Sequence, residues 1–232
     1  MTSRRTVLAS LASMGAAGLA RGALAQAGGD YVDFASPDLP DYTLLGTQPA
    51  LQSEVTRALA LLAAPACPTT SPINAMQYLS SLKDANADGE LYNAGWRTRW
   101  NPVIVEFFKS TGTRPSGDLT PWCAAGLNWV LGHCGVQGTG SASSATFRTA
   151  PGRTDAPVRG DVVCFRRTDP AEAALGHGHV ALFVSQDANS VLCLGCNQIR
   201  NGHHQVSQQN IQKNGFLTLD SFHSLSAFPR KP

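Results

Sequence analysis

The apolar residues of the first half of the chain follow helical spacing. Between residues 51 and 62 they recur every three or four positions, which predicts an amphipathic helix ended by a proline. Two further helix starts share a polar capping residue followed by proline, at Ser71-Pro72 and at Asn101-Pro102. Apolar residues at the same spacing follow both, so we expect two helices that pack their apolar faces on a core.

A third start of this kind, Thr120-Pro121, leads into a helix that carries a cysteine. Thr120 can cap this helix and Pro121 suits its first position, which leaves Cys123 among the amides that have no intrahelical partner. The apolar residues behind Cys123 recur on one side of the helix, at Ala124, Leu127, Leu131 and Cys134. This stripe would bury the helix and hold the thiol in place.

From Gly160 onward the pattern changes to short apolar runs separated by turn residues. The runs at 161–165, 179–185, 190–196 and 216–219 predict strands, and residues 187–189 predict a hairpin turn. Helices followed by an antiparallel meander indicate an α+β fold. Residues 84–99 lie between two predicted helices, and we expect them to form an ordered loop that borders a cleft.

The N-terminus resembles an export signal. Arg4 and Arg5 precede an apolar stretch and a small-residue run, an order typical of a twin-arginine signal peptide that is cleaved after Ala25. Removing residues 1–25 takes away three arginines and no acid, so 18 basic against 16 acidic residues becomes 15 against 16, and the formal charge falls from +2 to −1. We therefore expect a periplasmic or secreted protein with no nucleic-acid partner and no stable membrane anchor after cleavage.

The remaining chain suits one domain with an extension. With 43% hydrophobic and 15% charged residues it can bury a substantial core. Residues 26–71 are expected to form an N-terminal arm and a helix, and residues 72–232 the main domain. Of the six cysteines, five remain if one thiol is catalytic, so at least one more is unpaired.

Cys123 is the candidate nucleophile, because only a thiolate is a strong nucleophile and the positive end of a helix dipole favours that anion. Such chemistry needs a base for the thiol proton and a third polar group that holds the imidazole. His179 opens a predicted strand and is the candidate base, with His177 as its nearest competitor. Asn197 follows the next strand, and antiparallel pairing would place its amide oxygen beside the His179 ring.

Each of these assignments has a simpler alternative. Cys123 can be an ordinary buried cysteine, and Asn197 a plain turn asparagine. The pair Cys193 and Cys196, followed by His203-His204, is also conceivable as a zinc or redox site. Strand alternation would, however, turn the two thiols of that pair to opposite faces.

Six runs occur in order along residues 73–200 and carry a family resemblance. They are Asn101-Pro102-Val103-Ile104-Val105-Glu106-Phe107, Thr120-Pro121-Trp122-Cys123-Ala124-Ala125, Gly138-Thr139-Gly140-Ser141, Gly160-Asp161-Val162-Val163, Gly178-His179-Val180-Ala181 and Leu194-Gly195-Cys196-Asn197-Gln198. Together they resemble the bacterial CHAP/NlpC-type amidases and peptidases of the papain-like cysteine hydrolase superfamily.

The resemblance implies a papain-like α+β fold, in which N-terminal helices, including the nucleophile helix, pack on an antiparallel sheet. It implies a catalytic domain at 72–232 that hydrolyses amide bonds in peptidoglycan peptides without a metal or another cofactor. Carried over by position, Cys123 is the nucleophile, His179 the base and Asn197 the orienting residue. Trp122 is expected to line the cleft and bind substrate.

The chain departs from this family pattern at two positions. Cys196 stands where the pattern has glycine, and Gly126 stands where it has phenylalanine. The first departure puts a second thiol near the expected site, and the second loosens the nucleophile helix, since glycine costs up to about 1 kcal/mol relative to alanine. An exported protein that binds cell-wall peptides in the cleft without cleaving them is the remaining alternative.

Overall fold

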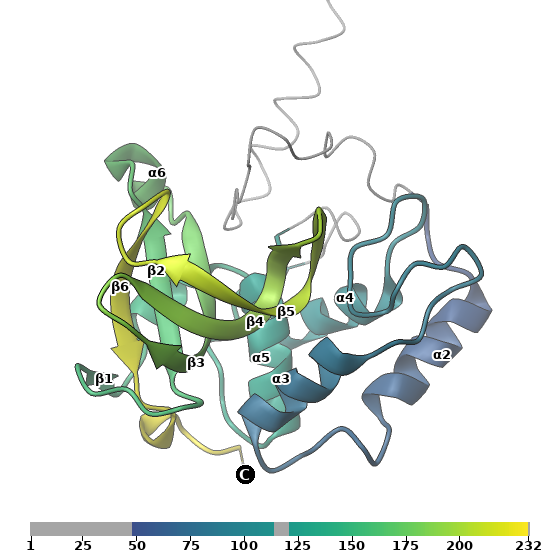
Figure 1. Ribbon diagram of the computed structural model, residues 1–232. Helices are drawn as coiled ribbons and strands as arrows, with labels where there is room; N and C mark the ends of the chain where they lie inside the picture. Colours follow the sequence, from purple (N-terminus) through teal and green to yellow (C-terminus); the bar gives the residue numbers. More distant parts are fainter. Residues whose placement is uncertain (1–47, 114–120, 232) are drawn as a thin grey trace, which may run out of the picture.

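The computed structural model of the chain describes residues 48–113 and 121–231 (Figure 1). The helices are α2 (Gln52–Leu62), α3 (Pro72–Ser81), α4 (Pro102–Phe107), α5 (Cys123–His133) and α6 (Pro170–Ala174). The strands are β1 (Arg153–Thr154), β2 (Val162–Arg167), β3 (Gly178–Gln186), β4 (Ser190–Arg200), β5 (His203–Gln212) and β6 (Leu217–His223). Helices α2 to α5 precede the sheet along the chain and α6 lies between β2 and β3, so the predicted α+β class is confirmed.

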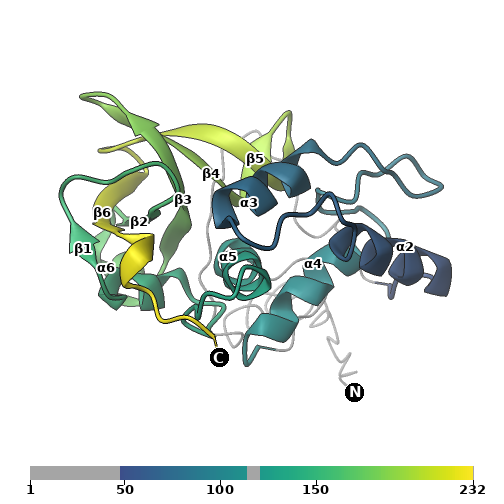
Figure 2. The ribbon, with the colours of Figure 1, turned by 90° about the horizontal axis from the view of Figure 1, so that it is seen from below.

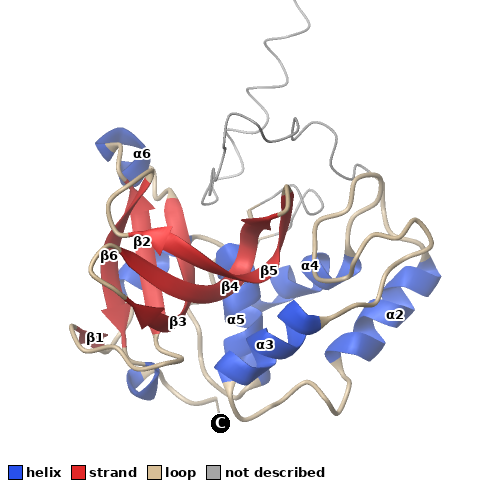
Figure 3. Ribbon diagram, in the orientation of Figure 1, coloured by secondary structure: helices blue, strands red, loops and turns tan. Residues whose placement is uncertain are grey.

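The six strands form one antiparallel sheet in the order β1-β6-β2-β3-β4-β5. Figure 3 shows the strands gathered on one side of the molecule, with α2, α3 and α4 on the other. The hairpin predicted at 187–189 joins β3 to β4, with Gln186 opposite Val191. Strand β5, at the edge of the sheet, has no counterpart among the predicted strands.

Helix α5 lies between the sheet and the helices α3 and α4. It packs on β3 and β4 with one side and on α3 and α4 with another, and Figure 2 shows it near the centre of the molecule. Consequently most residues of α5 are buried, and the predicted single stripe of apolar positions is only part of the buried surface. Within residues 48–113 and 121–231, no helix has both the length and the apolar character that crossing a bilayer requires.

Alternate residues of the strands belong to two separate cores. Val180 and Leu182 of β3 join the helix-side core, which contains the buried residues of α5. Ala181 and Phe183 join the outer core, a cluster on the other face of the sheet that also contains Val163 and Phe165. This alternation is the period of two that a strand buried on both faces requires.

The three proline-containing helix starts have different outcomes. At α4 the side chain of Asn101 accepts a hydrogen bond from the Val103 amide at 2.8 Å, as predicted. At α3 Ser71 takes the N-cap position without a side-chain bond. The third prediction is wrong in its boundary: α5 begins at Cys123 with Trp122 as its N-cap, and Pro121 precedes the helix, while Thr120 lies outside the described residues.

Candidate functional site

Cys123 is the first residue of α5 and is fully buried. Its amide therefore belongs to the first turn, whose N–H groups have no carbonyl partner within the helix. The neighbouring thiol is that of Cys196 on β4. Burial first, and the charge on a Cys123 thiolate second, raise the pKa of Cys196 well above its ordinary value, so Cys196 stays a neutral thiol.

The two departures from the family pattern meet in the structure. A Cβ atom added to Gly126 on α5 would lie 2.2 Å from Cys196 Sγ and 2.8 Å from Cys196 Cβ. The side chain of Cys196 thus fills the space that glycine leaves open on the helix. The small residue stands on the helix and the larger one on the strand, and together they let α5 approach β4 closely one turn after Cys123.

His179 is the second residue of β3 and is also fully buried. Alternation places it on the same face as Ala181 and Phe183, and its ring lies 6.5 Å from the ring of Phe165. Desolvation lowers the pKa of His179 to about 3, so the imidazole is neutral at pH 7.

Cys123 and His179 belong to the same end of the sheet. Strands β3 and β4 are antiparallel with Leu182 opposite Leu194, so the start of β3 and the end of β4 coincide. Cys123 is a neighbour of Cys196 near that end of β4, and His179 lies at that start of β3. The helix bearing the thiol covers one face of the sheet, and the imidazole belongs by alternation to the other face.

Asn197 has a different partner from the predicted one. The pairing of β4 with β5 is irregular between Gly195 and Gln198, and Asn197 has a φ of 57°, in the left-handed region. Its Oδ1 lies 2.9 Å from Nδ1 of His204 on β5. An amide oxygen only accepts, so Nδ1 of His204 carries the hydrogen. Burial lowers the pKa of His204 to about 4, which keeps this ring neutral.

The amide recorded beside the candidate base is that of Gln198, which sequence reasoning gave no role. Gln198 Nε2 lies 3.2 Å from His179 Nε2 and 3.3 Å from Cys193 Sγ, and the side chain is fully buried. Gly195 makes room for it, because a Cβ there would lie 2.9 Å from Gln198 Nε2. The bulge at Asn197 breaks the alternation on which the prediction relied, and no sequence signal marks that bulge.

The competing histidine and the predicted substrate-binding aromatic lie elsewhere. His177 precedes β3, and its Nδ1 lies 2.6 Å from Oε2 of Glu172 on α6. Trp122 is only 1% exposed and packs its ring 6.1 Å from that of Phe107. The expectation that Trp122 lines an open cleft is therefore not met, because its indole is part of the core beneath α5.

The Cys193 and Cys196 pair does not form one site. Cys193 belongs to the outer core and Cys196 to the helix-side core, as strand alternation predicted. All six cysteines of the chain are buried. Among residues 48–113 and 121–231, no three His, Cys, Asp or Glu side chains gather in a group that could hold a metal ion.

We compared the chain with protein-family models, with curated proteins and with solved structures, and none of the three comparisons gave a match.

Proposed function

We propose that the protein is an exported cysteine hydrolase with a papain-like fold that cleaves amide bonds in peptidoglycan. The observation that supports this most is the position of Cys123, at the first residue of a buried helix and at the end of the sheet where His179 opens β3. The family resemblance of the sequence adds the substrate class. In this proposal Cys123 is the nucleophile and His179 is the general base.

The start of α5 suits a nucleophile for two reasons. The positive end of the helix dipole stabilises the thiolate of Cys123 relative to the thiol. The backbone N–H of the same residue is one of the first amides of the helix, which make no bond within it, and an amide in this position can donate to a developing oxyanion. Loss of one such donor costs roughly a hundredfold or more in rate in comparable enzymes.

His179 would act from its neutral state. Because burial holds the pKa of His179 at about 3, the resting imidazole is neutral and can accept a proton. Because the imidazole lies by alternation on the face of β3 away from α5, the opening of the site must also bring it to the thiol. It then takes the thiol proton as Cys123 attacks the carbonyl carbon, and returns it to the leaving amine. The acyl group is held on sulfur until water hydrolyses the thioester.

We assign the orienting role to Gln198 instead of Asn197. An amide presents either its nitrogen or its oxygen to a ring nitrogen through a half-turn about its terminal torsion. With the oxygen toward the ring, Gln198 accepts from Nε2–H of His179 and leaves Nδ1 with the lone pair that takes the proton. Asn197, whose oxygen is held by His204, then shapes the bulge that delivers Gln198.

Burial adds a requirement for access. Cys123 and His179 both have an exposed fraction of 0%, so neighbouring atoms must move aside before a substrate carbonyl reaches the sulfur. Hydrolysis should therefore be slow under any condition that prevents these neighbouring atoms from moving aside.

The test is digestion of purified peptidoglycan, with the released fragments identified by mass. Cys123→Ala should abolish release while circular dichroism stays unchanged. His179→Ala should be nearly as severe, and the double variant should add almost nothing, because residues that act as one unit are not additive. His177→Ala is the matched control and should keep most of the activity.

Three outcomes would overturn the proposal or a part of it. Wild-type activity in both Cys123→Ala and His179→Ala would show that the protein is no cysteine hydrolase. Loss of activity in His177→Ala, with His179→Ala unaffected, would move the base to His177. Binding of peptidoglycan peptides without any cleavage by the wild-type protein would favour a binding protein.

A further inference from the structure

A pocket of about 510 Å³ lies between the loop after α3 and the tip of the β4–β5 hairpin. Its walls carry several charged side chains. The loop contributes Asp88, Glu90 and Arg97, and the hairpin contributes Arg200, His203 and Gln205. The loop is fixed to the hairpin by the bridge between Ala94 and Gln205 and by the Gly95 amide, which donates to the His204 carbonyl at 2.8 Å.

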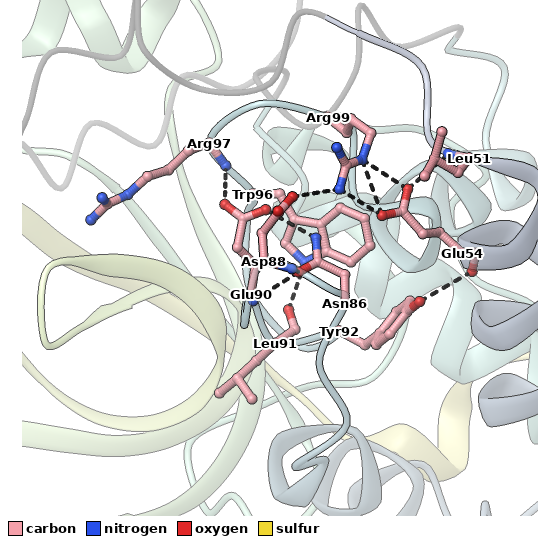
Figure 4. A network of polar contacts seen from close by, with 10 residues as sticks. All are labelled: Leu51, Glu54, Asn86, Asp88, Glu90, Leu91, Tyr92, Trp96, Arg97 and Arg99. Atoms are coloured by element: carbon pink, nitrogen blue, oxygen red, sulfur yellow. Dashed lines mark hydrogen bonds and ion pairs between the residues drawn. The ribbon is translucent and has the colours of Figure 1, made fainter.

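The acids of the pocket are already engaged within the loop (Figure 4). Asp88 pairs with Arg99 at 2.6 Å, and Arg99 also binds the buried carboxylate of Glu54 at 2.8 Å. Glu90 accepts the backbone N–H of Arg97 at 2.6 Å. These contacts hold the loop wall in place. They also partly neutralise the carboxylates of Asp88 and Glu90, so a ligand in the pocket meets less negative charge.

The cations of the pocket are not engaged in this way. Neither Arg97 nor Arg200 has an ion pair with any residue in the described ranges, and both side chains are exposed. Figure 4 shows the guanidinium of Arg97 extending away from the loop network. Two unpaired guanidinium groups on facing walls are the arrangement that binds a carboxylate, because the planar fork matches its two oxygens.

Strand register connects the pocket with His179. In the β4–β5 pair, Gln198 lies opposite Gln205 and Arg200 lies opposite His203. Directly opposite residues of an antiparallel pair share a face, as do residues two apart along a strand. Gln198, whose amide contacts His179, therefore lies on the same face of the hairpin as the pocket residues Arg200, His203 and Gln205, and the four form one row.

We propose that this pocket binds a carboxylate of an acidic peptide, through Arg97 and Arg200, and directs the peptide along the hairpin toward His179. This inference rests on the proposed function for the direction of the peptide. The walls favour a peptide over a phosphate. Although the carboxylates of Asp88 and Glu90 are engaged within the loop, they still repel a dianion, and their remaining lone pairs accept hydrogen bonds from peptide amines and amides.

The experiment measures binding of L-alanyl-γ-D-glutamyl-L-lysine to the full-length Cys123→Ser protein by calorimetry. The same tripeptide with amidated carboxylates is the ligand control. Arg97→Gln and Arg200→Gln should each weaken binding of the acidic tripeptide about tenfold, the effect of losing one charge-assisted contact at an exposed site. Neither variant should change binding of the amidated tripeptide.

Arg153→Gln is the matched protein control, since Arg153 lies on β1 at the opposite edge of the sheet. It should bind the acidic tripeptide as the parent does. Equal affinity of the two arginine variants and the parent would overturn the proposal, and so would displacement of the tripeptide by an equal concentration of inorganic phosphate. His179→Gln, which keeps Cys123, serves as a second parent if Cys123→Ser does not fold.

Failure of this inference and failure of the proposed function give different results. If the wild-type protein digests peptidoglycan and both arginine variants do so with unchanged KM, the pocket assignment is wrong and the hydrolase stands. If the tripeptide binds through the arginines and no variant or wild-type protein cleaves peptidoglycan, the pocket stands and the hydrolase is wrong.

Discussion

The contact between Gly126 and Cys196 makes a sharp prediction about the packing that holds the nucleophile helix. In Gly126→Ala the new methyl carbon would lie 2.2 Å from Cys196 Sγ, 2.8 Å from Cys196 Cβ and 3.3 Å from Phe107 Cδ2. Non-bonded carbon atoms normally lie about 3.5–4.0 Å apart, so the helix or the strand must move by roughly 1 Å or more. Overpacking of this kind costs about 1–3 kcal/mol.

The helix itself gains from the same substitution, because alanine is favoured over glycine by up to about 1 kcal/mol within a helix. We therefore expect a net loss of up to about 2 kcal/mol in the free energy of unfolding. For a chain of this size that corresponds to a fall in Tm of up to roughly 8 °C. Gly132→Ala, in the same helix, is the control, because its Cβ would meet only the flexible end of Lys231, at 2.7 Å from Nζ. It should be neutral or slightly stabilising.

A double-mutant cycle isolates the contact. Cys196→Gly removes both atoms that clash with the new methyl group, and by itself it destabilises by emptying the space beside Gly126. If the two residues are in contact as described, Gly126→Ala and Cys196→Gly together should be less destabilising than the sum of the single variants by about 1–3 kcal/mol. Urea unfolding of the four proteins gives this coupling energy directly.

The reasoning would be refuted by additivity. If the two single effects sum to the double effect within about 0.5 kcal/mol, α5 and β4 do not meet through these residues. A stabilising Gly126→Ala, similar to Gly132→Ala, would lead to the same conclusion.

The free energy of unfolding should decrease as the pH is lowered from about 6.5. The folded-state pKa of His179 is lowered to about 3, whereas the unfolded chain takes up this proton near pH 6.5. Between these two values the unfolded state therefore binds more protons than the folded state. Urea unfolding should show a loss of about 2 kcal/mol from this one group between pH 7 and pH 5, and His179→Gln should lose less. Gln198→Ala should reduce peptidoglycan hydrolysis more than Asn197→Ala does, and it should shift the pH profile of the reaction. Gln198→Glu retains a hydrogen-bond acceptor and should recover part of the rate. A larger loss in Asn197→Ala than in Gln198→Ala would return the orienting role to Asn197. Changing Arg4 and Arg5 to lysine should leave the protein inside the cell with residues 1–25 attached, as mass spectrometry of the cell fractions would show, and normal export of that variant would contradict the twin-arginine assignment.

The elements with a clear hydrophobic period were predictable from the sequence. Helix α2 follows apolar spacing of three and four, α4 begins at the cap that Asn101 supplies, and β2, β3 and β4 cover the predicted apolar runs. The opposite placement of Cys193 and Cys196 also followed, because it depends only on the period of two. These features depend on local pattern, which a single sequence records.

Strand β5 could not be predicted in this way. Its sequence from His203 to Gln212 is mostly polar, with Val206 and Ile211 as its only buried apolar residues. An edge strand whose side chains partly face solvent has no need of a continuous apolar run, so its position comes from pairing with β4. The start of α5 was also misplaced: Trp122, whose ring packs 6.1 Å from that of Phe107, takes the N-cap position and the helix begins at Cys123.

The candidate site was predictable only as far as strand alternation holds. Alternation placed His179 beside Ala181 and Phe183, but the bulge at Asn197 shifts the end of β4 by one position. The shift brings the amide of Gln198 to His179 and turns Asn197 toward His204. Because a one-residue shift exchanges the two faces of a strand, the identity of the orienting amide depends on tertiary structure.

Because all six thiols are buried, the rates at which they are chemically modified report how the folded protein opens. A thiol reagent in water cannot reach a fully buried sulfur, so each cysteine is modified only during excursions in which its surroundings separate. Cys193 samples the outer core, whereas Cys123 and Cys196 sample the contact between α5 and the sheet. When reclosing is fast, the modification rate of each cysteine measures the free energy of the opening that exposes it. Residue-by-residue labelling of the native protein would thus show whether the sheet and its central helix separate as one unit or in sequence.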